Sequence, residues 1–155
     1  MENKDYISAP YIARFTKSLL DILFYFGAVV VVSLHWSMPW AATFYPSVSD
    51  HLTFYEILFA PAGIFSELIL WELRKMLCTV LSDNCFIRRN VSSLKRMSLY
   101  AFAIAALMAV RVILFFTPGM LAIVCVFLLA GLFSLVLAQV FDRAVSYKQN
   151  DDLTI

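Results

Sequence analysis

Residues 120–141 read MLAIVCVFLLAGLFSLVLAQVF and contain no Asp, Glu, Lys or Arg. About 20 apolar residues in an α-helix cross the hydrocarbon layer of a bilayer, so this stretch predicts a transmembrane helix. The whole chain has the same character: of its 155 residues, 62% are hydrophobic and 15% are charged, and the mean hydropathy is +0.81. A soluble domain of this size leaves about a third of its unfolded surface exposed, and too few polar residues are present here to cover that surface. We therefore expect an integral membrane protein.

Three further stretches of the chain are long and apolar enough to cross a membrane, namely residues 19–38, 54–73 and 97–116. Glu67 and Arg111 fall inside the second and third of these, at a cost of about 3 kcal/mol each, which their apolar neighbours offset. The first stretch is too long for the core of a signal peptide and is predicted to be an uncleaved span. The sequence thus predicts an all-α membrane protein in which one domain contains four transmembrane helices.

Lysine and arginine are distributed unevenly among the segments that flank these spans. All of them except Arg111 lie before the first span, between the second and third, or after the fourth. Because cytoplasmic loops of membrane proteins are enriched in basic residues, this pattern predicts that the N and C termini are both cytoplasmic. The outer segment, residues 39–53, is bordered by aromatic residues of the kind found at membrane interfaces.

The third and fourth spans are joined by Thr117, Pro118 and Gly119 alone, which predicts a close antiparallel hairpin. Small residues recur every four positions on both spans, and such stripes allow two helix backbones to approach closely in lipid. They are Ala101, Ala105, Ala109, Ala130, Ser134 and Ala138. The same stripes are compatible with a homodimer interface, which remains an alternative to the hairpin within one chain.

The segment between the second and third spans, residues 81–96, has the pattern of an amphipathic helix. Asp83 is its predicted N-cap, and Ile87, Val91 and Leu94 recur at helical spacing. The opposite face is polar and mostly basic, and consists of Arg88, Arg89, Ser92, Lys95 and Arg96. We expect this helix to lie on the inner leaflet, where its cations either contact anionic lipid or form a docking surface for a cytoplasmic partner.

Three ionisable residues lie within the predicted spans. Glu56 and Arg111 have similar depths below the outer ends of their spans, which predicts a structural ion pair, with snorkelling of each side chain as the alternative. Glu67 lies near the middle of its span and is too short to snorkel. It is expected to face the bundle interior and to be protonated, to bond Ser66 or Ser134, or to bind a ligand.

The remaining polar residues do not indicate a catalytic centre. Four of them lie near the inner ends of spans and are assigned no function: Asp21, Glu72, Gln139 and Asp142. His35 and His51 lack the third ligand that a metal or haem site would need. The cysteines form no CxxC pair and are interpreted as packing residues: Cys78, Cys85 and Cys125. We expect no enzyme, no cofactor, no metal and no direct contact with nucleic acid.

The C-terminal half resembles a large family of small bacterial four-helix membrane proteins that is known only as a domain of unknown function. The resemblance begins at residues 83–90, DNCFIRRN, and continues with residues 94–96, LKR. It extends through residues 133–141, FSLVLAQVF, to the terminal DLTI of residues 152–155. Cys85 stands where the family typically has proline.

Members of that family are often encoded beside a small helix-turn-helix regulator of the phage-repressor type. The resemblance therefore implies the membrane component of a regulatory module, without enzymatic activity, that contacts this DNA-binding partner. The predicted docking residues are Arg88, Arg89, Lys95, Arg96, Asp152, Leu153 and Ile155. The alternative from another class is a small proton-coupled transporter or exporter component that uses Glu67.

Overall fold

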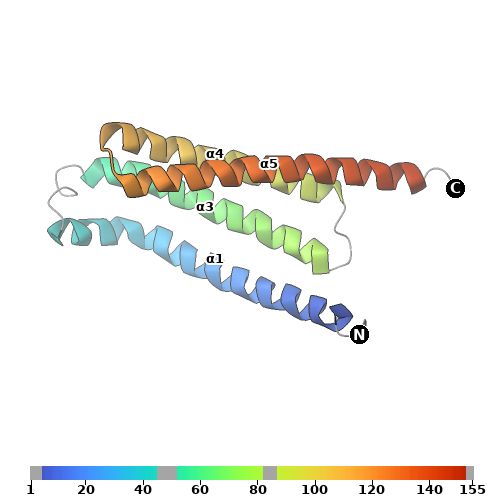
Figure 1. Ribbon diagram of the computed structural model, residues 1–155. Helices are drawn as coiled ribbons and strands as arrows, with labels where there is room; N and C mark the ends of the chain where they lie inside the picture. The colour runs from blue at the N-terminus through green and yellow to red at the C-terminus, as the bar shows by residue number, and fades with distance from the viewer. Residues whose placement is uncertain (1–4, 45–51, 82–86, 153–155) are drawn as a thin grey trace.

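The computed structural model describes residues 5–44, 52–81 and 87–152. All regular structure in this part of the chain is helical (Figure 1). The helices are α1 (Asp5–Phe44), α3 (Leu52–Leu81), α4 (Arg88–Leu114) and α5 (Pro118–Asp152). Each is long and apolar enough to cross a membrane. The prediction of an all-α protein with four helices long and apolar enough to be spans is therefore confirmed.

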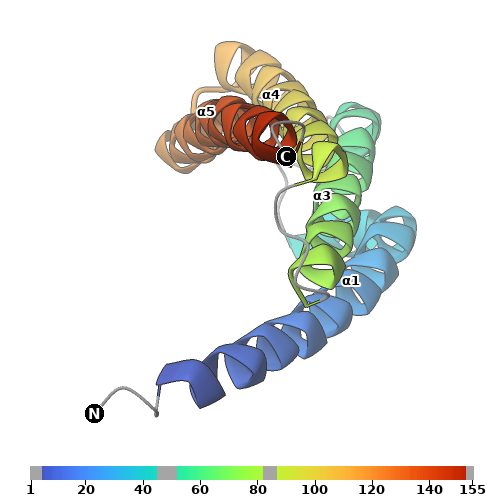
Figure 2. The same cartoon turned by 90° about the vertical axis from the view of Figure 1, so that its right-hand side faces the viewer.

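The helices pack side by side in chain order: among the described residues, Cα atoms of α3 lie within 8 Å of α1 and α4, and those of α5 lie within 8 Å of α4 alone. Viewed toward one end of the molecule, they form a curved layer that remains open between α1 and α5 (Figure 2). No Cα atom of α1 lies within 8 Å of one in α5 among the described residues. In lipid no hydrophobic force closes such a layer, because acyl chains solvate the apolar faces as well as another helix would.

One end of this open bundle collects most of the positive charge. α1 begins there, α3 ends there, α4 begins there and α5 ends there (Figure 1). Every described lysine and arginine except Arg111 lies toward this end, which we call the basic end. The opposite end, where α4 and α5 are joined, is called the distal end.

α4 and α5 form the predicted close hairpin, and its contact has the spacing of a coiled coil. Buried residues on α5 recur every seven positions, at Val124, Gly131, Ala138 and Val145. Buried residues on α4 recur at alternating steps of three and four: Val91, Leu94, Ser98, Ala101, Ala105 and Met108. A repeat averaging 3.5 residues keeps one seam of each helix against its partner over the full length of the contact.

The predicted small-residue stripes are correct for α4 and only partly correct for α5. Ala101, Ala105 and Ala138 are buried, whereas Ala130 is exposed and Gly131 takes the interior position. A four-residue step turns about 40° too far on a helix with about 100° per residue, so a stripe of that period drifts off the contact. A Cβ built on Gly131 would lie 2.9 Å from the Phe102 ring, which explains why glycine fits there.

The predicted amphipathic segment does not form a separate surface helix. Its residues 88–96, here called the basic segment, are the first turns of α4 and continue into the third span. Ile87 is the N-cap and makes no side-chain capping bond, while Asp83 lies outside the described residues. The apolar side chains Val91 and Leu94 are buried within the protein, because they lie on the face of α4 that packs in the hairpin.

Candidate functional site

A buried carboxylate joins α3 to the basic segment. The side chain of Glu72 is only 5% exposed and accepts hydrogen bonds on both oxygens. Ser93 Oγ donates to Oε2 over 2.8 Å, Lys75 Nζ to Oε1 over 3.2 Å, and Arg96 Nη1 to Oε1 over 3.3 Å. Glu72, to which the sequence assigned no function, thus connects two helices. The i,i+3 spacing of Glu72 and Lys75 could have indicated one of its partners, but Ser93 and Arg96 are brought to Glu72 only by helix packing.

A second buried hydrogen bond lies nearer to the end of α3. The Thr79 hydroxyl donates to Asn90 Oδ1 over 2.9 Å, and both residues are buried. Because an unsatisfied polar group in this position costs about 1–3 kcal/mol, the two bonds together strongly favour one placement of the start of α4 on α3. The basic segment is therefore held on a defined framework.

The predicted cationic docking residues lie together on this segment. Arg88, Arg89 and Lys95 are exposed, and the side chain of Arg96 is 59% exposed although it reaches Glu72. Arg88 Nη2 also donates to Gln149 Oε1 of α5 over 3.4 Å. The cations of α4 and the end of α5 thus form one surface.

The end of α5 extends well past a bilayer. Its 35 residues span about 52 Å, whereas the hydrocarbon layer is about 30 Å thick. α5 ends at Asp152, and Leu153 and Ile155 lie outside the described residues. The aliphatic part of the predicted docking tail is therefore not placed.

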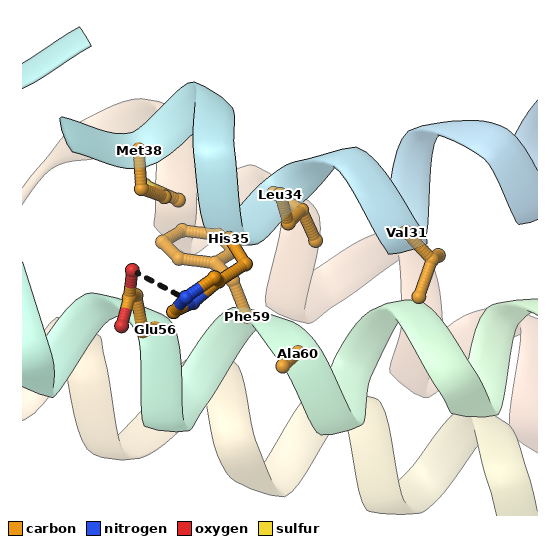
Figure 3. Close-up of a pocket in the computed structure, with 7 residues that line it drawn as sticks. All are labelled: Val31, Leu34, His35, Met38, Glu56, Phe59 and Ala60. Carbon is orange, nitrogen blue, oxygen red and sulfur yellow. Dashed lines mark ion pairs between the residues drawn. The ribbon is translucent and has the colours of Figure 1, made fainter. Parts of the chain in front are cut away.

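At the distal end, the predicted ion pair between Glu56 and Arg111 is wrong. Glu56 Oε1 instead lies 3.7 Å from Nδ1 of His35 across the contact of α1 and α3 (Figure 3). Arg111 Nη1 donates to Thr117 Oγ1 over 3.3 Å, and its guanidinium lies 5.4 Å from the centre of the Tyr55 ring. The depths of Glu56 and Arg111 match, but Glu56 faces α1, whereas α4, which carries Arg111, packs on the other side of α3.

His35 and Glu56 border a small cavity of about 100 Å³ between α1 and α3 (Figure 3). Apolar side chains such as Leu34, Met38 and Phe59 line the rest of it. No group of three His, Cys, Asp or Glu side chains with metal-binding geometry occurs in the described part of the chain. The geometry here fits a polar contact between two helices.

Glu67 lies near the middle of α3 and faces α1. It is 15 residues from the start of α3, or about 22 Å along the axis. A Cβ built on Gly27 of α1 would overlap Glu67 Oε1, so the carboxyl group fits only because Gly27 has no side chain. Its Oε2 is buried and has no hydrogen-bond partner among the described residues.

Neither predicted hydrogen-bond partner reaches Glu67. The Ser66 hydroxyl bonds the Ala62 carbonyl oxygen over 3.0 Å, and Ser134 belongs to α5, which does not pack on α3. The sequence placed Glu67 inside an apolar helix, but the approach of Gly27 was not evident from it.

Two grooves meet at Glu67. The first has a volume of about 350 Å³ between α1 and α3, and we call it the aromatic groove. It is lined by Phe24, Ala28, Val31, Val32, Ile64, Glu67, Leu68 and Trp71. The second, of about 340 Å³, is lined by residues of all four helices, including Gly27 and Ser66. Both volumes are in the range of small-molecule sites.

An ion pair borders the basic side of the α1–α3 contact. Arg74 Nε lies 2.6 Å from Asp21 Oδ1, and the guanidinium lies 4.8 Å from the centre of the Phe24 ring. The rings of Phe24 and Trp71 are 5.6 Å apart. Asp21, to which the sequence assigned no function, thus links α1 to α3.

The comparisons with known proteins identify a family and nothing narrower. No curated protein and no solved structure matches the chain significantly. A family model described as "Protein of unknown function (DUF2975)" matches residues 36–155, which include the whole of α3, α4 and α5 and the last turns of α1. The chain therefore belongs to the DUF2975 family.

Proposed function

We propose that this chain is a non-enzymatic protein of the cell membrane whose basic segment binds a cytoplasmic partner. The observation that supports the proposal is that the exposed cations of α4 sit on turns fixed by buried hydrogen bonds to α3. Side chains held in place lose less conformational entropy on binding than the cations of a flexible loop. The basic end is therefore suited to binding as well as to fixing orientation.

The proposal requires the basic end to face the cytoplasm, as the distribution of lysine and arginine predicts. In a variant without its own cysteines, a membrane-impermeant thiol reagent added to intact cells is expected to label cysteines placed at Ser47 or Ser49. It is expected not to label cysteines at Ser92 or Gln149 until the membrane is opened. Labelling at Ser92 in intact cells would show that the basic end faces outward, which would contradict the proposal.

The proposed partner is a helix-turn-helix regulator of the phage-repressor type, as the family resemblance implies. The DNA-binding face of such a regulator is basic, so the exposed cations of the basic segment would repel it. The regulator is expected to dock through an acidic face away from its DNA-binding helix, because opposite charges on the two surfaces favour that orientation.

Charge reversal on the basic segment tests this docking. The double variant Arg88→Glu with Arg89→Glu is expected to weaken binding of a purified regulator encoded beside the gene by about tenfold or more. Arg14→Glu with Lys17→Glu is the matched control, since these exposed cations lie toward the same end on α1. Binding by equilibrium titration in nanodiscs that is equal in both variants would show that the basic segment is not the docking surface.

The tail is tested separately by deleting residues 151–155. The deletion is expected to leave insertion intact and to weaken regulator binding. Unchanged binding would remove Asp152, Leu153 and Ile155 from the proposed surface while leaving the basic segment in it.

One observation favours the second candidate, a small proton-coupled transporter. Glu67 borders two grooves at mid-depth in α3, where a coupling carboxylate would be needed. In vesicles, Glu67→Gln would then abolish pH-driven flux, whereas a docking protein would keep its regulator affinity with the same substitution.

A further inference from the structure

We infer that the aromatic groove binds a lipophilic cation, with Glu67 as the counter-ion and the rings of Phe24 and Trp71 beside it. This inference concerns the α1–α3 contact and is independent of docking at the basic end. The result of the regulator-binding test does not affect it.

The first argument is that Glu67 has a buried oxygen atom, Oε2, without a hydrogen-bond partner among the described residues. An unpaired carboxylate in an apolar setting is costly. The two nearest cations on α3 are already engaged, because Arg74 pairs with Asp21 and Lys75 with Glu72. A positive charge from outside the chain would pair with this carboxylate.

The second argument is the composition of the groove. Apart from Glu67 its lining is apolar, and two of its members are aromatic. The face of an aromatic ring attracts a cation, and the Arg74 guanidinium, which does not line the groove, lies 4.8 Å from the centre of Phe24 and 5.8 Å from that of Trp71. A carboxylate beside aromatic rings is the combination that recognises a quaternary ammonium or phosphonium ion.

The third argument is depth, which decides between kinds of cation. Glu67 lies about 22 Å from the start of α3 and about 21 Å from its end, inside the stretch that is apolar enough to cross a membrane. Lipid head groups remain at the interface, and hydrated metal ions do not enter hydrocarbon. A cation that reaches Glu67 must therefore carry its own apolar surface.

The fourth argument is access. Among the described helices, α3 alone has Cα atoms within 8 Å of α1, and three of the side chains that border the groove are exposed. Val32 is 67% exposed, Ile64 53% and Trp71 45%. A molecule dissolved in the bilayer can enter from the side, and the volume of about 350 Å³ accepts a compact ligand.

The test measures equilibrium binding of tetraphenylphosphonium to the full-length protein in nanodiscs of phosphatidylcholine. This ion is permanently charged and apolar, and triphenylphosphine oxide serves as its neutral analogue. We expect saturable binding of the cation and at least about tenfold weaker binding of the neutral compound. Absence of saturable cation binding, or equal affinity for the two compounds, would overturn the proposal and indicate a site for acyl chains.

Three variants locate the site. Glu67→Gln keeps the size of the side chain and is expected to weaken cation binding at least about tenfold, whereas the control Glu56→Gln is expected to bind as the unmodified protein does. Trp71→Leu leaves Glu67 untouched and is expected to weaken binding about threefold, so the test does not depend on one variant folding. Unchanged affinity in both Glu67→Gln and Trp71→Leu would place the cation elsewhere and overturn the assignment.

Discussion

The two outer helix contacts of the molecule are built on different principles. The α4–α5 hairpin is continuous and mostly apolar, and buried alanine and glycine residues alternate along it with larger ones. The α1–α3 contact has cavities along its length and is crossed by the polar pairs of His35 with Glu56 and Asp21 with Arg74. Tight packing stabilises the first contact, and a few specific contacts position the second.

This difference separates stability from binding capacity. A contact that excludes all but close-packed side chains has no volume for a ligand, whereas the α1–α3 contact leaves about 350 Å³ beside Glu67, whose Oε2 has no hydrogen-bond partner in the described part of the chain. Contacts with few buried side chains also open at lower free energy than the core of a protein does. We therefore expect substitutions in the hairpin to change stability and substitutions in the α1–α3 contact to change binding.

The largest effect is expected from Ala105→Leu. Ala105 is buried in the hairpin, and three added carbon atoms would force the helices apart at a cost of about 3 kcal/mol. Ala106→Leu, on the adjacent exposed position, is the control and is expected to cost less than about 0.5 kcal/mol. Thermal unfolding of the two variants in one detergent measures the difference. Equal melting temperatures would refute the close-packed seam.

A smaller loss of stability is expected from Glu72→Ala, which removes the hydrogen bonds that connect α3 to α4. Ser93 would lose its buried hydrogen-bond acceptor, whereas Arg96 is exposed enough to be solvated by water. We therefore expect the free energy of unfolding to fall by about 2 kcal/mol. Glu56→Ala is the comparison, since its partner His35 is exposed, and is expected to cost less than about 1 kcal/mol. If both variants unfold alike, the bond network at the basic end does not stabilise the fold.

A matched pair of glycines compares the two contacts directly. A Cβ at Gly131 would lie 2.9 Å from the Phe102 ring, and a Cβ at Gly63 would lie 2.9 Å from a methyl of Val31. Val31 borders three cavities and can move, whereas Phe102 lies against the hairpin. We expect Gly131→Ala to cost about 1–2 kcal/mol and Gly63→Ala to be nearly neutral. The reverse order in thermal unfolding would contradict the proposed difference in packing.

The smallest effect is expected from Asp21→Asn. Its ion pair with Arg74 is partly exposed, and such pairs contribute about 0–1 kcal/mol. Global stability should therefore hardly change. Spin labels on α1 and α3 are expected to report a broader distance distribution at the basic end than in the unmodified protein. An unchanged distribution would show that the pair does not position α1.

The sequence predicted the features that are determined by the position of a residue along a helix. Uninterrupted apolar stretches require helices in lipid, because every backbone polar group must be bonded within its own segment. The number of long apolar helices followed from that requirement. The short connection at Thr117, Pro118 and Gly119 likewise dictated that α4 and α5 lie together.

Only the tertiary structure decided which side of each helix meets which neighbour. Depth is fixed by counting residues, whereas direction around the axis changes by about 100° per residue and depends on how the helices pack. For that reason the predicted ion pair of Glu56 with Arg111 was wrong, although the two residues lie at similar positions along their helices. For the same reason the buried residue of the hairpin is Gly131 and not the predicted Ala130. Gly27 faces Glu67 because α1 packs on α3 in one register, and no local pattern in either segment specifies that register.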